Sequence, residues 1–213
     1  CFYLFLEGAG SVADVFVNGE HVGQHRGAFT AAAFDLTPAV KFGQTNDLAV
    51  RVTNRDEEAA NCLSQSNLYY TNGGLYRPAW LIKTDAVHIF PDMGSTGVYL
   101  TPKNISRDSS DLEVKTYVRN AGAAAVDVTV RHTVTDPDGE ACAAFERTAA
   151  VPAGVTKPVT VSNPIDEPKL WDIHQPNLYT VHTQVIVDGE VVDALTERTG
   201  IRTVKMDNNR FMI

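Results

Sequence analysis

The sequence predicts an all-β protein of two domains, and three observations support this. Apolar and polar residues alternate over long segments, such as Asp111–Asn120 and Val126–Val134. Dipeptides typical of hairpin turns separate such segments: Asn-Gly at residues 18–19, and Asp-Gly at residues 138–139 and 188–189. No segment keeps a helical period of 3.6 residues for three turns, which excludes a predominantly helical fold.

The composition excludes several classes of function. The 213 residues carry a net charge of −8 and no cluster of Lys and Arg, which is unfavourable for binding nucleic acid or an anionic membrane. No run of about 18 apolar residues occurs, so we expect no membrane-spanning helix. Cys1, Cys62 and Cys142 are few and distant, which fits neither a disulfide framework nor a zinc site. The three cysteines therefore do not indicate the cellular compartment.

The first half of the chain reads as a β-rich unit. The segment "CFYLFLEGAG" has neither the basic region nor the cleavage site of a signal peptide, and it resembles the interior of a strand. We therefore expect residues to precede it in the natural protein. The segment "DLAVRVTN" alternates like a half-buried strand, and a long polar loop, Asn54–Asn67, follows it.

The second half of the chain predicts a separate sandwich. Residues 87–97, "VHIFPDMGSTG", combine a proline with two glycines and small polar residues, which indicates a domain junction near Phe90–Gly94. About seven strand candidates follow over roughly 110 residues, with turn signals every ~8–12 residues, as in an immunoglobulin-like sandwich. The cysteine pair that joins the two sheets of antibody domains is absent, so only the general architecture is implied.

The loop "NLYYTNGGLYRPAW" holds the candidate sugar-binding residues. Aromatic rings can stack on the apolar face of a pyranose, and an asparagine amide can bind its hydroxyl groups. The candidates on the rim of such a site are Asn67, Tyr69 and Tyr70. The alternative is a packed corner, in which glycines form the turn and the following residues enter the next strand. We favour this alternative for Tyr76, Arg77 and Trp80.

The histidines and acidic residues predict no metal site. His21 and His25 would share one face of a strand about 13 Å apart, too far to bind one ion. His132 lies on the apolar face of its strand, so we expect a core histidine with its hydrogen bonds satisfied. The sequence "DPDG" at residues 136–139 resembles the start of a calcium loop, but no acidic residue completes the loop at the required distance. A type I turn explains it better.

The carboxylates predict no catalytic site. Glycoside hydrolysis needs two carboxyl groups about 5–10 Å apart across a sugar. Here the acidic residues form a solvated run at residues 56–58 or are scattered over strand faces and turns. Neither a Gly-x-Ser-x-Gly motif nor a phosphate-binding or dinucleotide-binding loop occurs. The residues alone therefore indicate two β-domains with a sugar-compatible loop, and no cofactor.

Five segments together resemble the glycoside hydrolase family 2 enzymes, the family of bacterial β-galactosidase and β-glucuronidase. They match in the order that the family has them, over nearly the whole chain. The segments are "FLEGAGSVADVFVNGEHVGQHRGAFTAAAFDLT", "NDLAVRVTN", "GGLYRPAWLI", the pair "PKLW" and "PNLY", and "GIRTVKMDNNRFMI". The resemblance implies a jelly-roll sugar-binding domain, incomplete at its N-terminus, over residues 1–90. It also implies an immunoglobulin-like sandwich over residues 91–204 and a lead-in to a catalytic (β/α)₈ barrel over residues 205–213.

The resemblance implies a non-catalytic part of a longer retaining β-glycosidase. Both catalytic glutamates of the family lie in the barrel, the acid/base in an Asn-Glu pair, and this sequence holds no such pair. We therefore assign no catalytic residue and expect the chain to be inactive alone. Its expected partners are the barrel of the same polypeptide and a β-linked glycoside or oligosaccharide. A missing first strand would leave unpaired backbone, so we also expect self-association.

Two other functions fit the same sequence, namely a stand-alone carbohydrate-binding module and a structural or adhesive pair of β-sandwiches. Which sugar the parent enzyme cleaves depends mainly on the barrel. Both a cytoplasmic location and a periplasmic or extracellular one fit the sequence. In the resembled fold, Pro168–Tyr179 is the crossover that returns to the last hairpin of the sandwich. We interpret Trp171 within it as a structural plug rather than a sugar platform.

Overall fold

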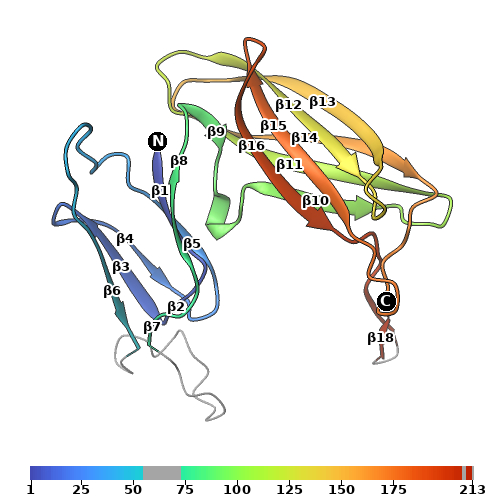
Figure 1. Cartoon of the computed structure of the whole chain (residues 1–213), viewed down its shortest axis with the longest axis horizontal. Coiled ribbons are helices and arrows are strands. Elements are labelled where there is room, and N and C mark those ends of the chain that lie inside the picture. Colours follow the sequence, from blue (N-terminus) through green and yellow to red (C-terminus); the bar gives the residue numbers. More distant parts are fainter. Residues whose placement is uncertain (55–72, 208–209, 213) are drawn as a thin grey trace. The chain divides into compact units, whose positions relative to one another are not determined.

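The computed structural model describes residues 1–54, 73–207 and 210–212, and confirms the all-β class (Figure 1). The chain divides into two compact units. The first comprises Cys1–Thr84 with Pro91–Thr96, and the second comprises Asp85–Phe90 with Gly97–Ile213. Among the described residues the one helix is η1, the three-residue 3₁₀ turn Asp92–Gly94, so no described helix is long and apolar enough to cross a membrane.

The first unit is an antiparallel sandwich of short strands. Its strands are β1 (Phe2–Leu6), β2 (Ala9–Gly10), β3 (Val12–Val17), β4 (Glu20–Arg26), β5 (Ala32–Asp35), β6 (Leu48–Thr53), β7 (Gly74–Leu75) and β8 (Ala79–Lys83). They form the sheets β5-β1-β8 and β4-β3-β6 and the pair β2-β7. Alternate residues of β1 and β3 point inward, so Leu4, Leu6, Val15 and Val17 build the core, as period-two alternation predicts.

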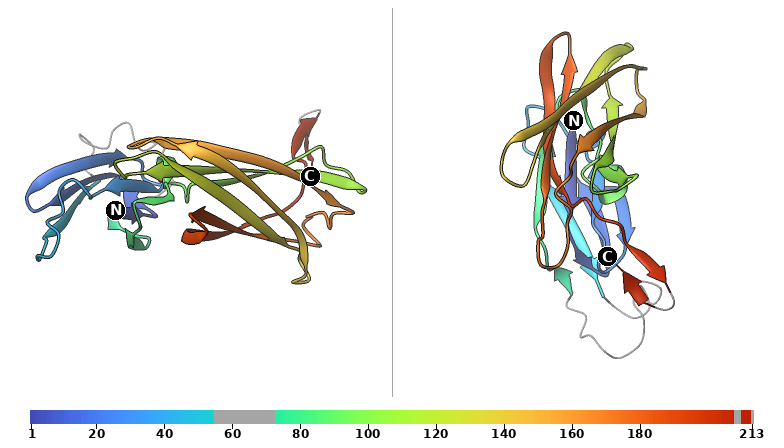
Figure 2. Two further views of the ribbon diagram at one scale, coloured as in Figure 1. Left: turned by 90° about the horizontal axis from the view of Figure 1, so that it is seen from above. Right: turned by 90° about the vertical axis from the view of Figure 1, so that its right-hand side faces the viewer.

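The second unit is the immunoglobulin-like sandwich (Figure 2). Its strands are β9 (Val87–Ile89), β10 (Val98–Lys103), β11 (Ser109–Asn120), β12 (Val126–Thr135), β13 (Ala141–Val151), β14 (Thr156–Asp166), β15 (Tyr179–Val187), β16 (Glu190–Thr199), β17 (Lys205–Asp207) and β18 (Arg210–Met212). One sheet has the order β10-β11-β14, with β9 also paired to β11, and the other has the order β13-β12-β15-β16. Inward-facing residues such as Leu112, Val114, Val128 and Val130 are fully buried between the sheets.

The predicted hairpin turns are present. Asn18 and Gly19 join β3 to β4 with φ angles of 53° and 83°, and the Asp-Gly pair at residues 188–189 joins β15 to β16 with φ angles of 51° and 85°. Two successive positive φ angles are the signature of the type I′ turn. In the third turn, the Gly139 N–H donates to the Asp136 carbonyl at 3.1 Å, as expected for a type I turn at "DPDG".

The chain crosses between the two units more than once around the expected junction. Strand β9 pairs with β11 in the second unit, with Ile89 opposite Val118. Residues 91–96 then belong to the first unit, and from Gly97 the chain belongs to the second. Phe90 and Gly97 are both held by Tyr117: the Phe90 N–H donates to the Tyr117 carbonyl at 2.8 Å, and the Tyr117 N–H donates to the Gly97 carbonyl at 2.9 Å.

The crossover loop, residues 167–178, is tied to the second unit at both ends. The buried Tyr179 begins β15, and its hydroxyl accepts a hydrogen bond from the Lys169 N–H at 2.8 Å. Such a bond from a tyrosine at the start of this strand to backbone upstream resembles the tyrosine corner of immunoglobulin-like domains. The ring of Trp171 is half-buried and packs so tightly on Gly200 that a Cβ there would lie 2.8 Å from the Trp171 Cδ1.

We expect Trp171→Ala to destabilise the second unit by about 3 kcal/mol, near the lower end for loss of a large aromatic side chain, because the ring is only half-buried. Trp171→Phe should cost less, since a ring still covers Gly200. Urea unfolding followed by far-UV circular dichroism measures both. A loss below about 1 kcal/mol in Trp171→Ala would refute the structural role.

His132 differs from the expectation of a satisfied core histidine. It is fully buried on β12, and its Nδ1 lies 3.0 Å from the Thr183 Oγ1. Its Nε2 is also buried but has no hydrogen-bond partner among the described residues. Burial lowers the pKa of His132 to about 4, so the ring is neutral near pH 7. The prediction of a core histidine is therefore confirmed, whereas the prediction that its hydrogen bonds are satisfied is wrong for Nε2.

Candidate functional site

The three predicted sugar-rim residues, Asn67, Tyr69 and Tyr70, lie outside the described residues. The two ends of the segment that holds them are close together in the first unit. A Cβ on Gly73 would lie 3.2 Å from the Asn54 Nδ2. The described flanking residues, Asn54 after β6 and Gly73 before β7, therefore lie side by side.

Tyr76 is anchored immediately after β7. Its hydroxyl donates to the Ala28 carbonyl, and its ring presses against Gly8, where a Cβ would lie 2.8 Å from the Tyr76 Cζ. Gly8 is therefore needed for this close approach rather than for an unusual φ angle. The Arg77 guanidinium lies 5.8 Å from the centre of the Tyr76 ring, within reach of a cation–π contact. Tyr76 is packed at this corner through its hydroxyl and the ring edge against Gly8, although its side chain remains 39% exposed, and Arg77 is exposed beside it.

Trp80 is more open than a packed corner would make it. Its side chain is 54% exposed on β8. The Trp80 Nε1–H donates to the Glu7 Oε1 at 2.7 Å, which fixes the orientation of the indole ring. An exposed, oriented indole can stack on the C–H face of a sugar, and the neighbouring Glu7 carboxylate can accept hydrogen bonds from the sugar hydroxyl groups. Glu7 escaped the sequence analysis because nothing near it in sequence marks it as the partner of a residue 73 positions away.

Asp14 is a buried carboxylate on β3, held in a polar network. Its Oδ1 accepts a hydrogen bond from the Gln24 Nε2 at 2.8 Å and lies 3.2 Å from the His21 Nε2, while its Oδ2 accepts from the Arg51 guanidinium at 3.2 Å. Burial by itself would raise the pKa of Asp14, but the bonds from Gln24 and His21 and the charge of Arg51 outweigh it and lower that pKa. Asp14 therefore stays ionised and cannot serve as a proton donor near pH 7.

The candidate metal ligands of the sequence have other partners. His21 contacts Asp14, and the His25 Nε2 lies 2.9 Å from the Thr30 Oγ1. In the "DPDG" turn, Asp136 and Asp138 are both bridged by the Lys169 ammonium, which occupies the place that a cation would take between two carboxylates. Over residues 1–54 and 73–207, no group of three His, Cys, Asp or Glu side chains could hold a metal ion.

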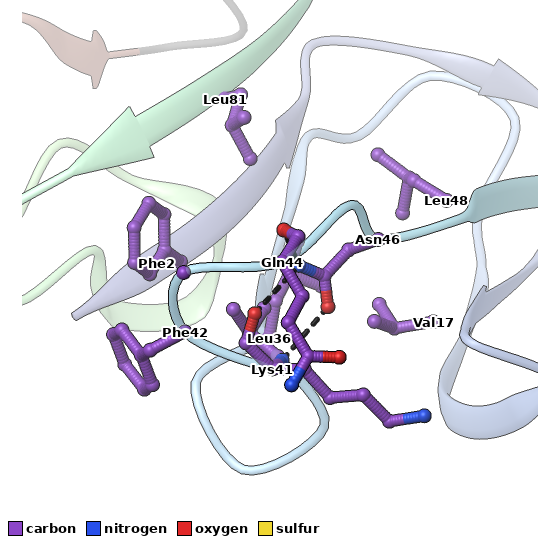
Figure 3. A pocket seen from close by; sticks show the side chains of 11 residues that line it. Phe2, Val17, Leu36, Lys41, Phe42, Gln44, Asn46, Leu48 and Leu81 are labelled. Atoms are coloured by element: carbon purple, nitrogen blue, oxygen red, sulfur yellow. Dashed lines mark hydrogen bonds between the residues drawn. The ribbon is translucent and has the colours of Figure 1, made fainter.

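A pocket of about 310 Å³ opens between the sheets of the first unit (Figure 3). Phe2, Leu81 and Leu48 come from β1, β8 and β6, and Phe42 lies across from Phe2, with the two ring centres 5.8 Å apart. The remaining lining residues are Val17, Leu36, Val40, Lys41, Gly43, Gln44 and Asn46.

The wall of this pocket is preformed. The Asn46 Oδ1 accepts from the Lys41 N–H at 2.7 Å, and the Asn46 Nδ2 donates to the carbonyls of Lys41 and Gln44 at 2.9 and 3.0 Å. Because these bonds occupy the Asn46 amide, the pocket offers mainly apolar contacts to a ligand. It is suited to hold apolar groups and carries no pair of acids for hydrolysis.

The pocket exists because core-facing side chains are left uncovered. Leu81 pairs with the core residue Leu4, and Leu48 pairs with the core residue Val17, so both point between the sheets. Yet Leu48 is 45% and Leu81 is 64% exposed. Strands β6 and β8 each have one strand partner among the described residues, β3 and β1 respectively, so each is an edge strand there.

We expect the 213-residue chain to self-associate through these two edges, because exposed apolar edge strands pair readily with other chains. Leu81→Lys should shift the chain toward the monomer, since a charge between the sheets opposes pairing. Multi-angle light scattering over a concentration series measures this. Val155→Lys, at an exposed apolar residue of the second unit, is the matched control and should leave the proportion of monomer to oligomer unchanged. A wild-type chain that stays monomeric would refute the expectation.

Comparisons with known proteins agree with this architecture. Residues 1–95 match the model of the glycosyl hydrolase 2 galactose-binding domain-like family, and residues 95–202 match the model of the glycosyl hydrolases family 2. A β-glucuronidase of Formosa agariphila is 32% identical over 209 residues, covering 94% of this chain and 21% of that protein. A β-galactosidase of Bacteroides ovatus is 31% identical over 206 residues, covering 97% of this chain and 23% of that protein.

Solved structures are similar over the same extent. The crystal structure of a putative β-galactosidase from Bacteroides fragilis has a TM-score of 0.88 at 32% identity, covering 96% of this chain and 30% of the other. A Bacteroides uniformis β-glucuronidase has a TM-score of 0.89 at 28% identity, covering 97% of this chain and 25% of the other. This chain thus spans less than a third of the length of these relatives. Because the matched models follow one another over residues 1–202, the chain belongs to the glycosyl hydrolases family 2.

Proposed function

We propose that this chain is the non-catalytic N-terminal region of a family 2 β-glycosidase. In this role it positions the catalytic barrel of the same polypeptide and helps to wall its sugar pocket. The observation that carries the proposal is the match of both family models, in order, to a chain that spans only 21% and 23% of two curated glycosidases. Hydrolysis is then the task of the remaining part of the parent protein.

The side chains of the first unit support a role at the pocket wall. Trp80 and the exposed Phe29 present apolar surface, and Tyr76, Gly8 and Glu7 hold the surrounding backbone and the indole ring in place. The candidates Asn67, Tyr69 and Tyr70 lie in the same loop sequence as Tyr76 and Trp80 and outside the described residues. An aromatic surface with a few fixed polar groups is the usual lining of a sugar or small-molecule site.

Activity assays test the proposal. The 213-residue chain and the complete reading frame of its source gene are each assayed with p-nitrophenyl β-D-glucuronide and p-nitrophenyl β-D-galactoside. We expect hydrolysis of at least one substrate by the complete protein and none by the 213-residue chain. Turnover by the shorter chain, or a complete protein that hydrolyses no β-glycoside, would contradict the proposal.

A stand-alone sugar-binding module is the second candidate, favoured by the exposed and oriented indole of Trp80. Under our proposal the isolated chain supplies only part of a pocket, so it should bind simple glycans at millimolar strength or weaker, about −4 kcal/mol or less favourable. Isothermal titration calorimetry with glucuronate and galactose distinguishes the two functions. Sub-micromolar binding would favour the stand-alone module.

A further inference from the structure

The outer face of the sheet β10-β11-β14 carries a lysine held by two tyrosine rings. Side chains of β11 alternate between the core and the outer face, so Lys115 and Tyr117 point outward on either side of the fully buried Thr116. Tyr99 on β10 lies directly opposite Lys115. The centres of the two tyrosine rings are 5.8 Å apart, with their planes at 71°. Tyr99, Lys115 and Tyr117 are called the tyrosine–lysine site below.

The Lys115 ammonium is positioned without using its hydrogen-bond donors. Its Nζ lies 5.1 Å from the centre of the Tyr99 ring and 5.2 Å from the centre of the Tyr117 ring, both within reach of a cation–π contact. In the described part of the chain, no oxygen accepts a hydrogen bond from this ammonium. Lys103 and Lys169 of the same unit, in contrast, are paired with carboxylates. A cation held in place with its donors available can bind an external anion at little cost in conformational entropy.

The charges around the tyrosine–lysine site favour an anion. The acidic side chains that β11 presents on this face already have partners: Glu113 accepts from the Lys103 ammonium at 2.8 Å, and Asp111 accepts from an asparagine amide at 2.6 Å. Arg119 lies two residues beyond Tyr117 on the same face, and its guanidinium donates to an uncharged carbonyl and a hydroxyl group. The local charge at this end of the face is therefore positive, although the whole chain is acidic.

The side chains around the ammonium are of the kinds that contact sugars. Both tyrosine rings are half-buried, so each leaves part of its surface for the C–H groups of a pyranose. On β14, the exposed Pro158 lies opposite Tyr117, and Thr160 lies opposite Lys115 with a hydroxyl group that can bond to sugar hydroxyls. These groups follow one another along the face of a sheet, which suits an extended chain of sugars.

We propose that the tyrosine–lysine site binds an acidic glycan, with a sugar carboxylate on the Lys115 ammonium and the C–H surface of the sugar rings against Tyr99 and Tyr117. The choice of a glycan over an acidic peptide rests on the proposed function, because a β-glycosidase meets its substrates as carbohydrate chains. All three residues belong to the second unit, whereas Trp80 and the apolar pocket belong to the first. The site therefore holds a glycan chain by itself and takes no part in hydrolysis.

A nuclear magnetic resonance titration of the 213-residue chain tests the site. The ligands are β-linked hexamannuronate and β-linked mannohexaose, which has the same sugar ring without the carboxylate. We expect hexamannuronate to bind with a Kd of about 1 mM or tighter and mannohexaose to bind about fivefold more weakly, the scale of an exposed ion pair. Amide shifts should concentrate in residues 99–101 and 115–119. Equal affinity for the two glycans, no binding of hexamannuronate, or shifts centred on Trp80 would overturn the proposal.

Three variants separate the roles of the charge and the ring. Lys115→Gln should weaken hexamannuronate binding about fivefold and leave mannohexaose binding unchanged. Tyr117→Leu should weaken the binding of both glycans, since a ring that contacts the sugar is lost. Lys103→Gln is the matched control, because it removes the same charge from the same sheet face at a lysine already paired with Glu113. It should leave both affinities unchanged, and an effect as large as that of Lys115→Gln would overturn the proposal. An unchanged thermal midpoint verifies that each variant folds.

A peptide of six glutamates, which has as many carboxylates as hexamannuronate, distinguishes the two kinds of acidic chain. We expect it to bind more weakly than hexamannuronate, because it has no sugar rings to lie against the tyrosines. Equal affinity would assign the site to acidic peptides and would overturn the proposal. Absence of glycan binding beside an active complete protein would overturn this inference alone. A complete protein that hydrolyses no β-glycoside would contradict the proposed function, and the measured binding at Lys115 would still stand.

Discussion

Gly97→Ala should destabilise the second unit by roughly 3–5 kcal/mol, through backbone strain and a steric collision acting together. Gly97 has a φ angle of +88°, which residues with a Cβ rarely adopt. A Cβ there would lie 2.1 Å from the Phe90 carbonyl oxygen and 2.9 Å from the Ile89 Cγ2. The backbone cannot move aside cheaply, because both Phe90 and Gly97 are bonded to the backbone of Tyr117.

Gly189→Ala is the matched control for Gly97→Ala. Gly189 has a nearly identical φ angle of +85°, but no atom lies within 4 Å of its added Cβ. Gly189→Ala should therefore lower the free energy of unfolding only through backbone strain, by about 1 kcal/mol. Urea unfolding in a Trp80→Phe background makes Trp171 the only tryptophan, so its fluorescence reports on the second unit. Equal losses of unfolding free energy in the two variants would show that the structure relieves the collision with Phe90, and would refute a steric contribution at Gly97.

The sequence predicts the fold well because the signals that define it are local. The alternation along Asp111–Asn120 and Val126–Val134 identifies which face of each strand is buried, whatever strand lies next to it. The Asn-Gly and Asp-Gly pairs adopt the positive φ angles that their turn type requires. Both signals depend on neighbours in sequence, so they are readable without a structure.

The site is less predictable because its features depend on what lies across space. Leu48 and Leu81 alternate like any core residues, and the pattern cannot tell whether a further strand covers them. The bond from Trp80 to Glu7 joins residues far apart in sequence. Whether a buried histidine is satisfied depends on the facing strands, which is why His132 met only half of the expectation. The roles of Asn67, Tyr69 and Tyr70 remain a proposal.

His132 should make the second unit lose about 3 kcal/mol of stability between pH 7 and pH 4. Burial lowers the pKa of the folded histidine to about 4, whereas the unfolded chain keeps the ordinary value of 6.5. Between these values the unfolded state binds more protons than the folded state. The contribution of His132 to stability is therefore fully present above pH 6.5 and is lost as the pH falls toward 4. The described contacts of the ring, Thr183 on β15 and Phe145 on β13, are uncharged and cannot offset the cost of charging it.

The double variant His132→Phe with Thr183→Val isolates this contribution. Replacing both partners of the hydrogen bond by apolar groups of similar shape should keep stability at pH 7 within about 1 kcal/mol of the wild type. The acid-dependent loss should then shrink by about 3 kcal/mol, as measured by urea unfolding at pH 7, 5.5 and 4.5 and extrapolated to pH 4.

The same pH series contains other titrating groups, so the difference between variants is the informative quantity. Burial also lowers the pKa of His88 in the second unit, and this contribution persists in the double variant. His182→Gln is the matched control, because His182 bonds to Thr196 and is not fully buried. It should leave the acid-dependent loss unchanged. If the double variant loses as much stability as the wild type between pH 7 and pH 4.5, the half-satisfied His132 is not the group that limits acid stability, and His88 becomes the remaining buried histidine to test.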